Sequence, residues 1–222
     1  TKIFNERFSE CGLKSNVIRP GFGMAEIVIM FSGSKEGLNG LCVDRNLFET
    51  KGEIKILNDN STDKNKKMLV SLGSQMDHHE IIIKGSDNHP LPEGSVGELM
   101  ISGPSVAKGY YENIHDTEEI FHQKIHGKEK LFLSTGDTAV MWNRKIYFAG
   151  RKKDLIIIRG RNYYPHDIEN VLSKIDELRP GCIMAFSSRS KNESEQLSIG
   201  VEVRSELIKD MKVFQKYILL SI

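Results

Sequence analysis

Apolar residues along this 222-residue chain occur in short runs that are separated by polar turns. Between Leu41 and Val106 the runs alternate with clusters of Gly, Asn, Asp and Ser, a spacing typical of a small antiparallel sheet or barrel. Two later runs are joined at Asn143-Arg144 as a predicted hairpin. The predicted strands are Gly52–Leu57, Lys67–Leu72, Glu80–Lys84, Gly97–Ser102, Leu131–Leu133, Ala139–Trp142, Lys145–Phe148, Leu155–Arg159, Cys182–Phe186 and Gln196–Val203.

Three segments are predicted to be helical. Residues 1–16 form the first, and Asp116–His122 form the second, with Asp116 or Thr117 near its N-cap. The third begins at Pro165, because proline suits the first turn of a helix. The apolar stripes are formed by Ile3, Phe4, Phe8 and Leu13 in the first segment and by Ile168, Val171, Leu172 and Ile175 in the third.

The pattern predicts an α+β fold in two parts. Charged residues interrupt two strand patterns at Arg151–Asp154, so we expect domains of residues 1–152 and 153–222. Ser32–Asn39 is rich in Gly, Ser and Lys and is predicted to be an exposed loop. The apolar tail at 213–220 has no evident partner, and we expect it to promote association or poor solubility.

Composition narrows the class of protein. The net charge is +1, from 31 basic and 30 acidic residues, which gives no electrostatic argument for a nucleic acid or an anionic membrane as partner. The three cysteines are far apart and form no Cys-x-x-Cys pair, which argues against a disulfide scaffold or a zinc site. We therefore expect the protein to reside in a reducing compartment. No apolar run is long enough to span a bilayer, and the start lacks a secretion signal. We therefore expect a cytoplasmic protein.

The segment Ser134–Asp137 offers the first candidate chemistry. Gly136 allows a sharp turn that would leave the Asp137 carboxylate exposed, where it could accept hydrogen bonds from the two hydroxyls of a ribose. An ordinary Asx turn at a strand end is the alternative. Arg151, at the end of another predicted strand, offers a fork of donors for a hydroxyl or phosphate, or is simply a solvated arginine.

Gly21–Glu26 combines flexible backbone with an aromatic ring and a carboxylate. Phe22 could stack on a purine, and Glu26 could hold a divalent cation beside phosphates. A core phenylalanine flanked by glycines is the alternative. Arg159–Arg161 could approach an anion or form a plain turn.

The remaining histidines and motifs give no support to a metal site or a nucleophile. His78 and His79 are adjacent, and adjacent residues of a strand point to opposite faces, so they cannot readily share one ion. His89 lies apart from them. No Gly-x-Ser-x-Gly motif or Cys/His pairing indicates nucleophilic catalysis.

Taken together and in this order, these segments resemble the adenylate-forming ligases, which include acyl-CoA synthetases, peptide-synthetase adenylation domains and luciferases. Gly21–Glu26 is similar to the family's Gly-Tyr-Gly-x-x-Glu motif. Gly97–Leu99 and Val106–Tyr110 are similar to its Gly-Glu-Leu and Val-Ala-x-Gly-Tyr segments. Thr135–Asp137 and Gly150–Glu169 resemble its ribose-binding and hinge motifs.

Within that family the chain resembles the fatty acyl-AMP ligases. The segment near residues 31–45, from Phe31–Gly33 to Val43–Arg45, is similar to an insertion that this branch carries. In the branch, the insertion is thought to impede the domain movement that is needed for transfer to coenzyme A. The resemblance extends to Val70–Gly73, Asp154–Asn162 and Leu178–Cys182. It implies ATP-dependent activation of a fatty acid to an acyl-adenylate, followed by transfer to an acyl carrier protein.

The resemblance also implies roles for individual residues. Phe22 would pack on adenine in a nucleotide-binding segment, and Glu26 would act as a catalytic residue near the phosphates and Mg²⁺. Asp137 and Arg151 would bind the ribose of ATP or AMP, and Asp154 would be the hinge. The nucleotide-binding segment would consist of Gly21, Phe22, Gly23, Met24 and Ala25. Residues 1–152 would be the C-terminal part of the large adenylation domain, and residues 153–222 a truncated lid domain.

Several departures from the family pattern limit what the chain is expected to do. Ser134 stands where an arginine is usual, and Thr138–Val140 departs from a more typical Leu-Gly-Phe-like continuation. The family's Ser/Thr/Gly-rich phosphate loop and its late lysine are both missing. We therefore expect a fragment that is inactive alone or is complemented by a separate N-terminal half, so whether it is itself an enzyme stays open. The alternatives are a fragment of an acyl-CoA synthetase and a non-catalytic nucleotide-binding or interaction remnant.

Overall fold

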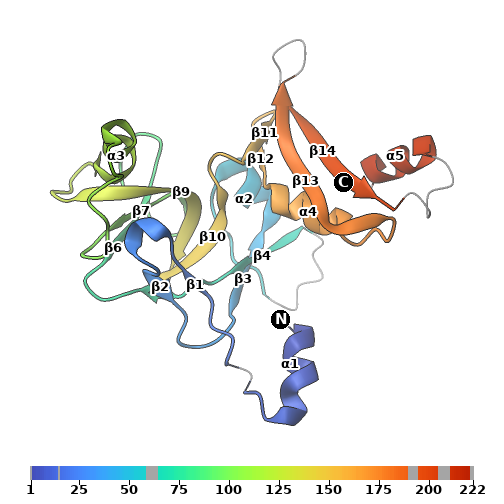
Figure 1. The fold of residues 1–222 in the computed structure, drawn as a ribbon, viewed down its shortest axis with the longest axis horizontal. Coiled ribbons are helices and arrows are strands. Elements are labelled where there is room, and N and C mark those ends of the chain that lie inside the picture. Colours follow the sequence, from blue (N-terminus) through green and yellow to red (C-terminus); the bar gives the residue numbers. More distant parts are fainter. Residues whose placement is uncertain (1, 15, 59–64, 190–194, 205–210, 221–222) are drawn as a thin grey trace. The chain divides into compact units, whose positions relative to one another are not determined.

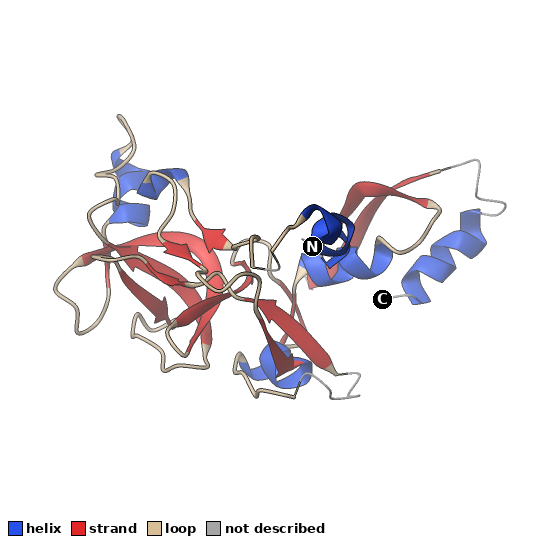
Figure 2. Ribbon diagram, turned by 90° about the horizontal axis from the view of Figure 1, so that it is seen from below, coloured by secondary structure: helices blue, strands red, loops and turns tan. Residues whose placement is uncertain are grey.

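The computed structural model describes residues 2–14, 16–58, 65–189, 195–204 and 211–220. Its contacts divide the chain into two compact units, Thr1–Lys152 and Lys153–Ile222, here called unit 1 and unit 2. Among the described residues every strand pair is antiparallel, and helices are few and short, as Figure 2 shows. The predicted α+β fold class is confirmed.

Unit 1 is built around a five-stranded sheet in the order β10-β9-β7-β6, with β8 pairing to β9 (Figure 1). Two smaller sheets, β1-β2-β5 and β3-β4, accompany it. The elements of unit 1 are α1 (Lys2–Phe8), η1 (Ser9–Cys11), β1 (Gly21–Phe22), η2 (Ala25–Ile27), β2 (Ser32–Gly33), β3 (Gly40–Asp44), α2 (Arg45–Lys51), β4 (Lys66–Val70), β5 (Ser74–Gln75), β6 (Glu80–Lys84), β7 (Val96–Ser102), α3 (Ile114–Phe121), β8 (Gln123–Lys124), β9 (Leu131–Trp142) and β10 (Lys145–Arg151).

The main sheet of unit 1 is buried on both faces. Successive side chains of a strand point to opposite faces, so an uninterrupted apolar run such as that of β6 requires cover on each side. Phe121 of α3 contributes to one of the two clusters. The clusters include Ile81, Ile83, Leu99, Ile101 and Leu133 on one face and Ile82, Met100, Ile125 and Phe132 on the other.

The structure confirms some predicted elements of unit 1 and corrects others. The hairpin at Asn143-Arg144 is present, and both residues have positive φ, as in the tight turns that match strand twist. The predicted strand Gly52–Leu57 is reduced to isolated antiparallel bridges at Glu53 and Ile56. It is preceded by α2, which Asp44 caps by accepting from the Leu47 N–H at 3.0 Å and which the left-handed Gly52 ends.

Two further expectations for unit 1 are corrected. Ser32 and Gly33 belong to β2, which pairs with β1 and β5, rather than to an exposed loop, and Ser32 is buried. The cap of α3 is Asn113, whose side chain accepts from the Asp116 N–H at 3.2 Å. Asp116 therefore lies inside the first turn instead of at the N-cap.

Unit 2 pairs a long hairpin with helices. Its elements are β11 (Ile156–Ile158), β12 (Arg161–Tyr163), α4 (Pro165–Leu172), β13 (Leu178–Arg189), β14 (Glu195–Val203) and α5 (Met211–Leu220). Pro165 opens α4, as predicted, and the helix buries Ile168 and Leu172, whereas Val171 of the predicted apolar face is exposed. Arg159 and Gly160 form the two-residue turn between β11 and β12.

The apolar tail has a partner inside unit 2, which corrects the expectation that it lacks one. Phe214 and Ile218 of α5 are both buried in a cluster with Ile168, Leu172 and other apolar side chains of the unit. Their spacing of four residues places them on one face of the helix. None of the described helices is long and apolar enough to cross a membrane.

Replacing Phe214 with Ala removes a buried ring from the core of unit 2, and we expect it to destabilise that unit by about 3 kcal/mol. The readout is the loss of hydrogen-exchange protection of the α4 amides. Leu219→Ala, at a neighbouring position whose side chain is exposed, should change protection by less than about 0.5 kcal/mol. Equal protection in the two variants would contradict the packing of α5.

Candidate functional site

Ser134–Asp137 lies inside the continuous strand β9, so the predicted tight turn between two strands is wrong. In the pairing of β9 with β7, Ser134 lies opposite Met100 and Thr138 lies opposite Glu98. Three residues of β9 therefore stand opposite a single residue of β7. Such a bulge bends the strand and redirects its side chains, and bulges are common beside functional sites.

Two hydrogen bonds hold the bulge in place. The Thr135 hydroxyl donates to the Leu99 carbonyl at 2.9 Å, and the Asp137 N–H donates to the Thr135 oxygen at 3.1 Å. Gly136 has φ +71°, and a Cβ built on it would meet no atom within 4 Å. The glycine is needed for its backbone conformation and not for space.

The structure brings Asp137 and Arg151 together. They face each other across β9 and β10, and Arg151 Nε lies 3.4 Å from Asp137 Oδ1. A second irregularity, between Phe148 and Gly150, brings the end of β10 beside the bulge. The predicted exposure of the Asp137 carboxylate is wrong, because its side chain is only 8% exposed, whereas that of Arg151 is 71% exposed. The arrangement offers a fixed acceptor next to a cation that can rearrange around a ligand.

Glu26 is linked to another of the predicted motifs. Its Oε1 accepts from the Tyr110 hydroxyl at 2.8 Å, and its backbone carbonyl accepts from the Ala107 N–H at 2.8 Å. Burial, together with the hydrogen bond and negative charge of Glu26, raises the pKa of Tyr110 to about 12. A carboxylate held through one oxygen can still offer the other to a divalent cation.

The remaining residues of Gly21–Ala25 form a tightly folded segment. Phe22 is half-buried, and its ring centroid lies 5.2 Å from that of Phe31 in an edge-on arrangement. Gly23 is required by space, because a Cβ there would lie 1.6 Å from the Ile29 carbonyl oxygen. Met24 packs against the same core and Ala25 begins η2. Phe22 is thus held by the core while part of its surface stays exposed.

Glu98 of β7, which the sequence analysis placed in a family motif without giving it a role, is a buried carboxylate beside the bulge. It is 8% exposed and receives a hydrogen bond from the Ser134 hydroxyl at 2.5 Å. Lys152 Nζ lies 2.9 Å and Lys84 Nζ lies 3.2 Å from its Oε2. Burial raises the pKa of Glu98, but the hydroxyl and the two ammonium groups outweigh burial, and the net pKa lies below its ordinary value. A charged residue in an apolar strand was the signal for it.

Asp154, the predicted hinge residue, is exposed in the segment that follows β10 and precedes β11. Of the histidines considered in the sequence, His79 Nε2 lies 2.6 Å from the Ser105 hydroxyl, and the ring of His89 lies 4.2 Å from that of His126. Each therefore has a local partner of its own.

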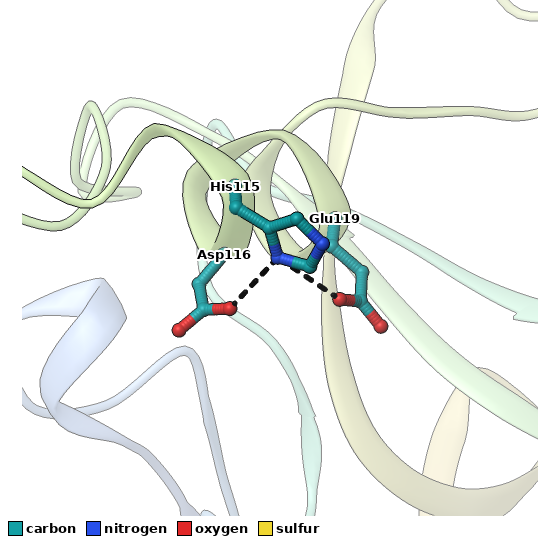
Figure 3. Close-up of side chains that lie close together, drawn as sticks. All are labelled: His115, Asp116 and Glu119. Carbon is teal, nitrogen blue, oxygen red and sulfur yellow. Dashed lines mark hydrogen bonds and ion pairs between the residues drawn. The ribbon is translucent and has the colours of Figure 1, made fainter.

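Among the residues that the structure describes, one group could share a cation: His115, Asp116 and Glu119 at the start of α3. Figure 3 shows the imidazole between the carboxylates. Its Nδ1 lies 3.2 Å from Asp116 Oδ1 and 3.8 Å from Glu119 Oε2. His115 and Glu119 are exposed, and Asp116 also accepts from the capping Asn113 side chain at 2.7 Å. Helix capping and surface ion pairing account for this group.

Comparisons with known proteins indicate the family of the chain. A family model described as AMP-binding enzyme matches residues 3–111. The chain is 32% identical over 215 residues to the long-chain-fatty-acid–AMP ligase FadD28 of Mycobacterium tuberculosis, a match that covers 91% of this chain and 35% of that protein. A structure from a study of fatty acyl-adenylate ligases from E. coli and L. pneumophila matches with TM-score 0.80 and 29% identity, over 98% of this chain and 37% of that one.

The chain belongs to the adenylate-forming, AMP-binding enzyme family. A further relative, the medium-chain-fatty-acid–[acyl-carrier-protein] ligase TtuA of Teredinibacter turnerae, is 31% identical over 183 residues, which is 78% of this chain and 28% of that protein. The chain spans about a third of the length of the curated relatives that it matches.

Gly136→Ala should cost about 1–2 kcal/mol of stability, because a Cβ disfavours the left-handed conformation even in open space. Chemical unfolding followed by circular dichroism measures this loss. Gly33→Ala is the matched control in unit 1, since its φ lies outside the left-handed range and the nearest atom to a built Cβ is 4.0 Å away. Equal losses would show that the conformation of Gly136 is not what matters.

The lowered pKa of Glu98 predicts a dependence of stability on pH. The contribution of ionised Glu98 to the free energy of unfolding is present above the unfolded-state pKa of about 4.5. It is lost as pH falls through the lower folded-state pKa. Unfolding of the wild type and of Glu98→Gln, measured from neutral pH to below 4.5, should therefore show a difference that shrinks toward acid. A difference that stays constant with pH would contradict an ionised Glu98.

Proposed function

We propose that this chain is part of a fatty acyl-AMP ligase. Such an enzyme uses ATP to convert a fatty acid into an acyl-adenylate with release of pyrophosphate, and then passes the acyl group to an acyl carrier protein. The proposal is supported by the relatives, which include a fatty acid–AMP ligase and a fatty acid–acyl-carrier-protein ligase. It is supported equally by the likeness of both units to a fatty acyl-adenylate ligase structure.

The pairing of Asp137 with Arg151 is the observation that carries this proposal. A carboxylate has lone pairs enough to accept from both hydroxyls of a ribose, and the exposed guanidinium can donate to the same sugar. The Asp137 carboxylate is already oriented by the bulge and by Arg151 at 3.4 Å. The exposed Arg151 side chain is the part of this pair that has room to rearrange around a nucleotide.

The segment Gly21–Ala25 is proposed to form the adenine side of the same site. The half-buried ring of Phe22, supported by Phe31, presents a flat apolar surface of the kind on which a purine packs. Glu26 has the donor set that Mg²⁺ prefers, and we propose it as the ligand that would hold the ion and as a catalytic residue. When bound, the ion would neutralise phosphate charge during attack by a carboxylate.

The two units are proposed to match the two parts of the family architecture. We assign residues 1–152 to the C-terminal part of the large adenylation domain and residues 153–222 to part of the lid domain. Asp154 is proposed as the hinge, because it is exposed and lies in the short segment between the last strand of unit 1 and the first strand of unit 2. This segment lacks regular structure and so can absorb changes in φ and ψ.

Titration calorimetry with AMP and with its 2′,3′-dideoxy analogue tests the proposal. The purified chain should bind AMP more tightly than the analogue by roughly 10- to 100-fold, because the analogue cannot donate to the buried carboxylate. Asp137→Asn should weaken AMP binding by a similar factor and should remove most of the discrimination between the two ligands.

Asp77→Asn is the matched control, since it removes an exposed carboxylate elsewhere in unit 1. It should leave both affinities within about twofold of the wild type, well under 1 kcal/mol. Absence of AMP binding by the wild-type chain, or unchanged discrimination in Asp137→Asn, would overturn the ribose assignment.

A further inference from the structure

Glu98 lies in a row of paired residues that crosses the whole main sheet of unit 1. Lys84 of β6 faces Glu98 of β7, Glu98 faces Thr138 of β9, and Thr138 faces Gly150 of β10. The Thr138 hydroxyl also donates to the Gly150 carbonyl at 3.0 Å. This row ends at the residue before Arg151, so Glu98 is connected across two strands to the end of β10.

The carboxylate of Glu98 has partners on both of its oxygens. Oε1 accepts from the Ser134 hydroxyl at 2.5 Å, and Oε2 accepts from Lys152 Nζ at 2.9 Å, with Lys84 Nζ at 3.2 Å. Burying a charge is costly unless it is paired and hydrogen-bonded. A carboxylate at 8% exposure therefore holds its partners firmly, because losing one leaves the charge poorly compensated.

Lys152 is the partner of Glu98 that matters for the site. It is the last residue of unit 1 and follows Arg151 directly. Its backbone N–H donates to the Gly136 carbonyl at 2.8 Å, so it is tied to the bulge of β9 as well as to Glu98. With both ends of Lys152 held, the position of the neighbouring Arg151 backbone is fixed, and so is the point where the hinge segment starts.

We propose that Glu98 is a positioning residue whose side chain latches Lys152 to the main sheet, thereby fixing the strand end that carries Arg151 and the start of the hinge. This inference extends the proposed function and rests on it, because it assumes that Arg151 and Asp137 bind a ribose. Its structural part is independent of any ligand: the carboxylate restrains the backbone at Lys152.

Hydrogen exchange of the amides at Gly150–Lys152 in the whole chain tests the structural part. Glu98→Gln should accelerate exchange of the Lys152 amide by roughly tenfold or more relative to the rest of the sheet. Lys152→Gln should do the same, and because that side chain is 60% exposed the variant keeps the test valid even if Glu98→Gln folds poorly. Combining the two substitutions should add little.

Lys84→Met is the matched control, because it removes the other ammonium group from the same carboxylate oxygen and leaves Lys152 in place. Its effect on the Lys152 amide should stay within about twofold after correction for global stability. If Lys84→Met and Glu98→Gln accelerate this amide equally, or if neither does, there is no latch and Glu98 has only a general role in stability.

The affinity for AMP separates this inference from the proposed function. If wild type binds AMP, Glu98→Gln and Lys152→Gln should both weaken binding about three- to tenfold, whereas Lys84→Met should not. Unchanged affinity in both latch variants would overturn the positioning role. If wild type does not bind AMP, the proposed function fails, while the exchange result still decides whether Glu98 restrains Lys152.

Discussion

Hydrogen bonding of β9 along both of its edges is the constraint on which the candidate site depends. β7 is hydrogen-bonded to one edge of β9 and β10 to the other, so β9 cannot slide along either neighbour. The extra residues of β9, which have no partner residue in β7, therefore cannot be accommodated by a shift of the strand. They bulge instead, and the bulge turns Asp137 toward Arg151. The backbone geometry thus comes first, and the pairing of the two side chains follows from it.

Electrostatics adds a second restraint at the same place. Glu98 is a single negative charge facing two lysines, and Ser134 supplies the remaining hydrogen bond as a neutral donor. An arginine at position 134, the residue expected there from the family resemblance, would place a third cation against one carboxylate. The serine is therefore consistent with the lysines around it. The expected departure at Ser134 therefore fits the charges of Lys84 in β6 and of Lys152 directly after β10.

Much of the fold was predictable from local patterns in the sequence. The continuous apolar run of β6, the hairpin at Asn143-Arg144 and the start of α4 at Pro165 were all predictable, because each depends on neighbours in sequence. The burial of Phe214 was not, since it depends on contacts across unit 2. The bulge and the pairs of Glu98 were missed for the same reason: they arise from register between strands, which sequence spacing does not reveal.

The three-against-one register of β9 and β7 also bears on how this region can diverge over time. Gaining or losing one residue between Ser134 and Thr138 would turn the rest of β9 over, exchanging its buried and its outward side chains. Changes of residue type leave that alternation intact, whereas changes of length do not. Descendants of this sequence should therefore vary between Ser134 and Thr138 by replacement of one residue type with another, and not by insertion or deletion.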